Sequence, residues 1–198
     1  VVEMVLAGRI NKNIASKINS VGGKAVGVSG KDGSMIIAEK LTKQGNAGES
    51  NIEKIVDLGY VGFPKKINNE IIETLIEQDF IPVIAPLGIG DDGRTYNINA
   101  DTAAGSIASS LKAKRLLVLT DVEGVLDSNG DLVEEVNEEK IKTMVKTGEV
   151  SGGMIPKLST CLESINNGVT AAVIVDGRVK HAVLLELFTD HGAGTLIR

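Results

Sequence analysis

The sequence has little of what disulfide-bonded, zinc-binding and nucleic-acid-binding proteins need. Its 198 residues include one cysteine, Cys161, and two histidines. This excludes a disulfide framework and leaves too few soft ligands for a structural zinc site. Lysine and arginine number 21 against 26 aspartates and glutamates, which gives a formal net charge of -5, and the basic residues are scattered singly. Nucleic acid is therefore not an expected partner.

Long apolar runs are also missing. No stretch approaches the roughly 20 apolar residues that a membrane span requires, and no signal-peptide pattern opens the sequence. With 42% hydrophobic and 24% charged residues, the chain has the composition of a globular protein, which we expect to be cytoplasmic and without a membrane partner. The opening residues, Val1 to Leu6, lack an initiator methionine and are typical of a helix interior. We therefore expect that the beginning of the protein is missing.

Two patterns near the start predict a helix and a hairpin. Apolar residues recur at every fourth position from Leu6 to Ile18 and the run ends at Gly22-Gly23, which predicts an amphipathic helix. Two short β-type runs, 25–28 and 34–38, flank a turn that contains Asp-Gly. This arrangement predicts a hairpin.

The rest of the chain alternates between extended and helical patterns. Residues 42–51 are polar and predict an exposed loop. After them, strands are expected at 60–63, 80–87, 115–120 and 170–175, and helices at 69–78, 101–111, 137–147, 154–167 and 182–188. Such alternation predicts an α/β fold with a mainly parallel sheet covered on both faces, decorated by the hairpin.

One apparent nucleotide motif is discarded. The segment from Gly88 to Gly93 matches G-x-G-x-x-G, but Arg94-Thr95-Tyr96 follows it where a dinucleotide site needs a helix. We predict instead a turn between two strands with Asp92-Gly93 at its tip. The sequence contains no P-loop.

Three polar side chains precede the helix expected at 101–111. Asn97, Asn99 and Asp101 occupy alternate positions after a buried strand, which places them together at the carboxyl edge of a sheet, where open α/β sheets bind ligands. Asp101 also lies at or beside the N-cap of the helix, so capping alone is an alternative explanation for it.

A second candidate segment follows the apolar run that ends at Leu119. Asp121 and the glycine-containing residues after it stand at a strand's carboxyl end. Backbone groups there are suited to the base or ribose of a nucleotide, although Asp121 could also merely turn the chain.

The third candidate is Ser151-Gly152-Gly153-Met154-Ile155-Pro156-Lys157 at the start of a helix. Backbone N–H groups at such a start favour anions. Lys157 opposes the helix dipole there, which a phosphate facing both would offset. The alternative is a solvated surface lysine. Cys161, one turn later between leucines, is expected to pack in the core.

These segments, together with Val2 to Gly8 and Gly192 to Ile197, make the chain similar to N-acetylglutamate kinases over essentially its whole length. The resemblance implies an amino acid kinase fold, a three-layer αβα sandwich. Residues 1–111 would be the remainder of an N-terminal lobe that binds N-acetylglutamate and dimerises, and 112–198 an ATP-binding lobe. The implied reaction transfers the γ-phosphoryl of MgATP to the γ-carboxylate of N-acetyl-L-glutamate in arginine biosynthesis.

The resemblance also implies roles for individual residues. Lys157 and Asp101 match catalytic positions, the lysine neutralising phosphate charge and the aspartate organising catalytic lysines, and Asn97 and Asn99 match the acceptor site. The residues expected around the nucleotide are Asp121, Val122, Gly124, Val125, Leu126, Ser151, Gly152, Gly153 and Met154. No protein metal site is expected, because Mg²⁺ arrives with ATP, and an ionised γ-carboxylate needs no general base.

The family's Lys-x-Gly-Gly phosphate loop, His-Gly-Gly-Gly turn and substrate-binding arginine motif do not occur in this sequence. We therefore do not expect these residues alone to be a competent kinase. Alternatives are a regulatory module that binds arginine or nucleotide without catalysis, or another amino acid kinase such as glutamate 5-kinase.

The ending Gly-Ala-Gly-Thr-Leu-Ile resembles the family members that arginine inhibits. His181, Glu186, Gly192 and Gly194 are therefore candidates for an L-arginine site, with ordinary surface residues as the alternative. The resemblance further implies a homo-oligomer, a dimer or a hexamer.

Overall fold

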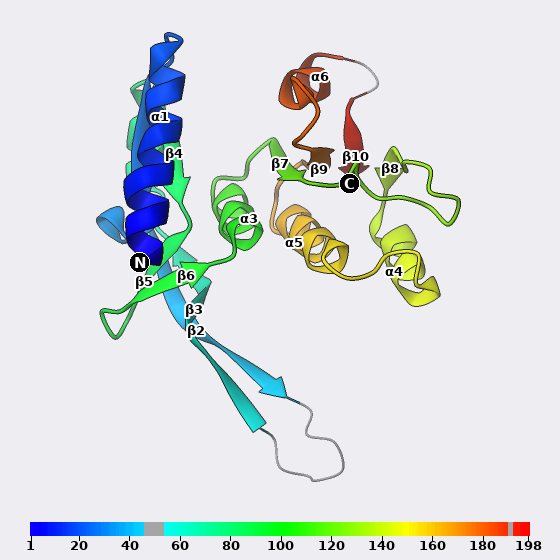
Figure 1. The fold of residues 1–198 in the computed structure, drawn as a ribbon, viewed down its shortest axis with the longest axis horizontal. Helices are drawn as coiled ribbons and strands as arrows, with labels where there is room; N and C mark the ends of the chain where they lie inside the picture. The colour runs from blue at the N-terminus through cyan, green and yellow to red at the C-terminus, as the bar shows by residue number, and fades with distance from the viewer. Residues whose placement is uncertain (46–53, 190–191) are drawn as a thin grey trace. The chain divides into compact units, whose positions relative to one another are not determined.

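The computed structural model describes residues 1–45, 54–189 and 192–198. They form two compact units, Val1–Ala103 and Ala104–Arg198, and each carries its own sheets (Figure 1). The boundary between the units falls inside helix α3, whereas the predicted boundary between the two functional lobes follows residue 111. Within the described residues, no helix combines the length and the apolar character needed to cross a membrane.

The first unit combines helices with a two-stranded parallel sheet and a small closed barrel. Its elements are η1 (Met4–Ile10, a π-helix), α1 (Asn11–Ser20), β1 (Ala25–Ser29), η2 (Asp32–Ser34), β2 (Ile36–Gly45), β3 (Lys54–Ile67), α2 (Glu70–Glu77), β4 (Ile81–Ala85), β5 (Leu87–Gly90), β6 (Thr95–Ile98) and the first turn of α3 (Ala100–Ser110). The predicted turn between two strands is confirmed, since the Gly93 N–H donates to the Gly90 carbonyl between β5 and β6.

The predicted first helix is present as η1 followed by α1. The apolar residues that predicted it are not the ones that it buries. Ile10 and Ile14 are each 44% exposed, whereas Asn11 is 3% exposed. The Nδ2 group of Asn11 donates to the Val28 carbonyl at 3.0 Å and to the Val83 carbonyl at 2.7 Å. A polar side chain thus fastens this helix to β1 and β4.

The hairpin predicted between residues 25–28 and 34–38 is wrong. Strand β1 pairs in parallel with β4, and β2 pairs antiparallel with β3. The intervening turn is a 3₁₀ segment with Gly33 at φ +56°, and the Ile36 N–H closes it by donating to the Gly30 carbonyl. The chain thereby leaves the first sheet for the barrel, whose strand order is β2-β3-β6-β5. Strands β2 and β3 form an antiparallel pair in this barrel. Residues 42–45 of the predicted polar loop belong to β2, and residues 46–51 of that loop lie outside the described residues.

The second unit is a four-stranded sheet between helices. After α3 come β7 (Arg115–Thr120), β8 (Glu135–Val136), α4 (Glu138–Thr147), α5 (Met154–Asn166), β9 (Ala171–Asp176), α6 (Ala182–Phe188) and β10 (Gly194–Ile197). The strand order is β7-β9-β10-β8, with β7 parallel and β10 antiparallel to β9. The predicted α/β class is confirmed. The short strands β8 and β10 were not expected.

Strand β9 is one of the two inner strands of this sheet, and both of its faces are buried. Ala172 and Ile174 belong to the cluster that contains Leu158 of α5, and Val173 and Val175 pack with Ala182 of α6. The alternation follows the two-residue period of a strand. Helices α5 and α6 therefore cover opposite faces, which gives this unit three αβα layers (Figure 1).

Candidate functional site

Strands β7 and β9 end side by side. Thr120 lies opposite Asp176 in the parallel register, and the Gly177 N–H donates to the Thr120 carbonyl at 2.8 Å. Asp121 follows the end of β7 directly, and Arg178 stands two residues after the end of β9. This carboxyl edge is the part of an open α/β sheet where ligands bind.

Helix α5 brings its first turn to the same edge. It packs along β9, and a tight turn joins its end to the start of that strand, closed by the Val169 N–H donating to the Ser164 carbonyl at 3.0 Å. The helix therefore runs back along the sheet. A helix of 13 residues and a strand of 6 residues are both about 20 Å long, so the helix start is level with the strand's carboxyl end.

Two glycines leave this helix start open. Gly152 has φ +57°, which favours glycine, whereas Gly153 has an ordinary φ of -68° and provides no side-chain cap. A Cβ at either position would meet no atom within 4 Å. Uncapped N–H groups at a helix start attract anions. Lys157 is partly buried one turn into the helix, with exposed Ser151 and partly buried Met154 beside the glycines.

The segment predicted to surround the nucleotide is a loop with a buried inner part. Gly124 and Val125 are buried, while Asp121, Val122 and Leu126 are exposed. The buried residues fix the loop to the unit. The exposed side chains at the carboxyl edge of the sheet are the ones that a ligand can contact.

An ion pair at this edge was missed by the sequence analysis. Arg178 donates from Nε at 2.9 Å and from Nη2 at 2.8 Å to the carboxylate of Asp176, whose side chain is 8% exposed against 63% for Arg178. These hydrogen bonds lower the pKa of Asp176 and raise that of Arg178, and the charges of Asp121 and Glu123 raise the latter further. The sequence signal was Asp-Gly-Arg directly after an apolar strand.

In the first unit, Asn97 lies in the middle of the barrel sheet. It is opposite Val61 of β3 and Leu87 of β5. Its neighbours Tyr96 and Ile98 are buried, whereas Asn97 is partly buried. Because side chains alternate along a strand, the Asn97 side chain points to the face of the sheet opposite to that of Tyr96 and Ile98.

Asn99 caps α3, and Asp101 lies beside this cap in the first turn of the helix, where a carboxylate is favoured. The Oδ1 atom of Asn99 accepts the Thr102 N–H at 3.2 Å, and the Asn99 carbonyl accepts the Ala103 N–H. Asp101 is partly buried in the first turn of the helix. Its predicted role in organising the catalytic lysines stays a prediction.

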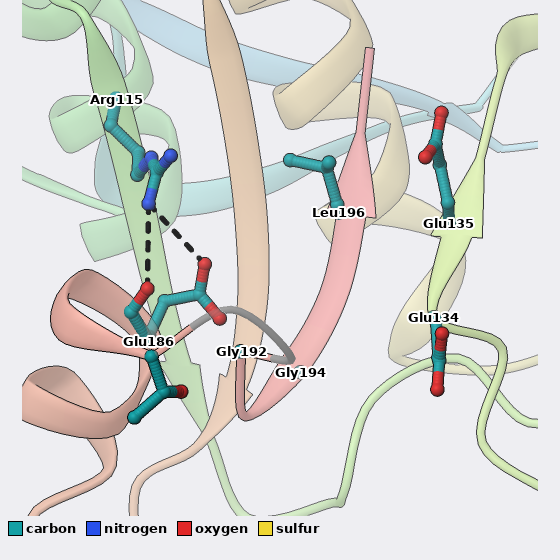
Figure 2. Close-up of a pocket in the computed structure, with 8 residues that line it drawn as sticks. Arg115, Glu134, Glu135, Glu186, Gly192, Gly194 and Leu196 are labelled. Carbon is teal, nitrogen blue, oxygen red and sulfur yellow. Dashed lines mark hydrogen bonds and ion pairs between the residues drawn. The ribbon is translucent and has the colours of Figure 1, made fainter.

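A separate pocket of about 260 Å³ contains three of the four residues predicted for arginine (Figure 2). It lies in the second unit and is lined by Arg115, Glu134, Glu135, Glu186, Thr189, Gly192, Gly194 and Leu196. His181 is not among the lining residues. It stands before α6 with a left-handed φ of +62° and is exposed.

Glu186 is the central charge of this pocket. Its Oε1 lies 3.5 Å from Nη1 of Arg115 (Figure 2). Its Oε2 accepts the Ala193 N–H at 2.9 Å. Gly192 has φ +64°, and a Cβ there would lie 2.7 Å from Oε2. Glu135 forms an ion pair with Arg198. With three carboxylates and one guanidinium among its lining residues, the pocket is acidic.

Within residues 1–45, 54–189 and 192–198, no group of three or more histidine, cysteine, aspartate or glutamate side chains could hold a metal ion.

An α/β unit with an open helix start beside the carboxyl edge of its sheet is an arrangement that phosphate- and nucleotide-binding proteins use. The model of the amino acid kinase family matches residues 1–176, and the chain belongs to this family.

The most informative relatives are acetylglutamate kinases. The chain is 58% identical over 198 residues to the acetylglutamate kinase of Parvibaculum lavamentivorans and 57% identical to that of Rhodospirillum rubrum. All of this chain is covered in both cases, but only 65% and 64% of those proteins. The chain thus spans somewhat less than two thirds of their length. Among solved structures, smu.665 from Streptococcus mutans UA159 matches with a TM-score of 0.75 and 28% identity, over 98% of this chain and 69% of that one.

Proposed function

We propose that this chain is part of an acetylglutamate kinase, which transfers the γ-phosphoryl group of ATP to the γ-carboxylate of N-acetyl-L-glutamate for arginine biosynthesis. The observation that carries the proposal is the 58% identity to an acetylglutamate kinase along the entire chain. The open helix start at Gly152-Gly153 supports it, since phosphates are anions and bind such starts. As part of this proposal, the enzyme is a cytoplasmic homodimer or hexamer.

In this proposal the nucleotide lies at the carboxyl edge of the second unit. Lys157 and the N–H groups at the start of α5 neutralise the phosphates as the β–γ bridge breaks, and Mg²⁺ enters with ATP. Phosphoryl transfer depends on such positioning and electrostatics rather than on a protein nucleophile. Asn97 hydrogen-bonds the acceptor and Asp101 organises the catalytic lysines. The acceptor carboxylate is ionised at neutral pH and attacks without a general base.

The experiment that tests this function uses the full-length protein and follows acyl phosphate as its hydroxamate. MgATP is supplied with N-acetyl-L-glutamate or with L-glutamate, at matched concentrations. We expect the acetylated substrate to be preferred at least about 100-fold in kcat/KM, because a site built to bind the acetyl amide leaves buried polar groups unpaired without it. A preference for L-glutamate would indicate a glutamate 5-kinase. MgATP binding without any acyl phosphate would indicate a nucleotide-binding module.

We further propose that L-arginine inhibits this enzyme by binding the pocket around Glu186. A guanidinium group matches a carboxylate bidentately, and this pocket holds three carboxylates. Calorimetry with L-arginine should show binding that neutral L-citrulline, of nearly the same shape, does not reproduce. Glu186→Gln should weaken arginine binding at least about tenfold. The exposed control Glu163→Gln should leave it unchanged, and tight binding to the Glu186 variant would contradict the assignment.

A further inference from the structure

We infer that Thr195 is a positioning residue for the nucleotide-binding loop, residues 121–126, and that its hydroxyl sets the affinity for ATP. The inference rests on the proposed function for the identity of the ligand. Thr195 lies on β10, is 0% exposed, and accepts the Val125 N–H on its Oγ1 at 2.9 Å. This buried hydrogen bond joins residues 70 positions apart in the chain.

The hydrogen bond holds the middle of the loop from inside. Val125 is 1% exposed, and its carbonyl accepts the Val133 N–H at 2.8 Å. Both backbone groups of Val125 are therefore engaged, one by the chain that returns from the loop and one by the Thr195 side chain. A buried N–H that loses its partner is costly, so the loop would shift to regain one.

Gly124 is the counterpart of Thr195 on the loop. Its φ is +149°, and a Cβ there would lie 2.7 Å from Thr195 Oγ1 and 2.7 Å from Cδ1 of Leu132. Glycine at this position therefore lets the hydroxyl approach the Val125 N–H. Gly124 and Thr195, both buried, thus fix one backbone position of the loop.

The loop side chains beside this position are the exposed ones. Val122 is 40% exposed and Leu126 is 37% exposed, on either side of the buried pair Gly124 and Val125. Beyond them the chain turns on its own contacts, because Oδ1 of Asp127 accepts two backbone N–H groups. Thr195 therefore determines the position of the exposed side chains of Val122 and Leu126, while the Asp127 side chain stabilises the following turn without Thr195.

The test compares Thr195→Val with Thr195→Ser in the full-length protein. Valine keeps the volume and removes the acceptor, whereas serine keeps the hydroxyl. Thr143→Val is the matched control, since Thr143 is exposed and its hydroxyl donates to the Glu139 carbonyl within helix α4. We expect Thr195→Val to raise KM for ATP at least about fivefold, with kcat and KM for N-acetyl-L-glutamate within about twofold of wild type. Serine should restore KM for ATP, and exchange of the Val125 amide hydrogen should accelerate only in the valine variant.

The contrary outcomes are distinct. An unchanged KM for ATP in Thr195→Val, with an active wild type, would overturn the role of Thr195 and leave the proposed function standing. A fall in kcat with unchanged KM values would show a loss of folded enzyme and would also overturn it. If valine prevents folding, the serine variant decides, because a raised KM despite its hydroxyl would contradict the inference. A wild type that neither binds MgATP nor forms acyl phosphate would remove the proposed function and this role with it.

Discussion

Replacing Gly153 with alanine should separate ligand binding from folding at the start of α5. Gly153 has φ -68° and ψ -13°, which alanine adopts without strain, and a Cβ there would meet no atom within 4 Å. Alanine restricts the unfolded chain, which stabilises by about 0.4–1 kcal/mol. Alanine is also a poorer N-cap than glycine by a similar amount. The free energy of unfolding should therefore change by less than about 1 kcal/mol.

The effect on the nucleotide should be much larger. If phosphate oxygens contact the N–H groups around Gly153, the added methyl group occupies their space. Each charge-assisted hydrogen bond lost costs about 1.5–3 kcal/mol, which corresponds to a rise in KM for ATP of roughly 10- to 100-fold. The assay is steady-state kinetics on the full-length protein, with urea unfolding of the same samples.

Gly8→Ala is the matched control for this substitution. A Cβ at Gly8 likewise meets nothing within 4 Å, and the residue lies in η1 of the first unit, outside the segment Ser151 to Lys157. This variant should keep the KM for ATP of the wild type. An unchanged KM in Gly153→Ala would refute the placement of the phosphates at the start of α5.

Two further predictions concern the second unit. Gly105→Ala would place a Cβ 2.7 Å from Cγ2 of Thr160 on α5. Overpacking costs about 1–3 kcal/mol, and the higher helix propensity of alanine returns about 1 kcal/mol. Urea unfolding should therefore show that the free energy of unfolding falls by up to about 2 kcal/mol. A rise in the free energy of unfolding would contradict this packing of α3. Arg178 holds the pKa of Asp176 below its ordinary value. The ionised pair therefore stabilises the fold fully at pH values above about 3.9, the pKa of an aspartate in the unfolded chain. This stabilisation is lost as the pH falls through the lower pKa that Asp176 has in the folded protein. Asp176→Asn should therefore destabilise more at pH 7 than at about pH 3, and an equal effect at both would argue against the pair.

The elements that the sequence predicted well are those in which local pattern and burial agree. β7 was expected at 115–120 and observed at Arg115–Thr120, and α6 matches its expected range. Both have an apolar run with clear ends. The hairpin prediction failed because an Asp-Gly turn specifies a reversal but not the partner strand, and β1 pairs with β4 more than fifty residues later.

The candidate site was predicted where one segment supplies both backbone and side chain, as at Gly152 to Lys157. Two of the contacts that were missed join distant segments, unlike the local pair of Asp176 and Arg178. Arg115 meets Glu186 across 71 positions, and Thr195 meets Val125 across 70. Nothing in the local sequence around Arg115 or Thr195 distinguishes either residue from an ordinary surface residue. These contacts therefore become visible only when the sheet is packed.

The most direct test of the central claim is kcat for acyl phosphate formation by the full-length Lys157→Ala variant, with the exposed Lys146→Ala as control. Removing a charge-assisted phosphate contact of about 1.5–3 kcal/mol should lower kcat roughly 10- to 100-fold, while the control keeps wild-type turnover. An unchanged kcat in Lys157→Ala would contradict the assignment of this helix start to phosphoryl transfer.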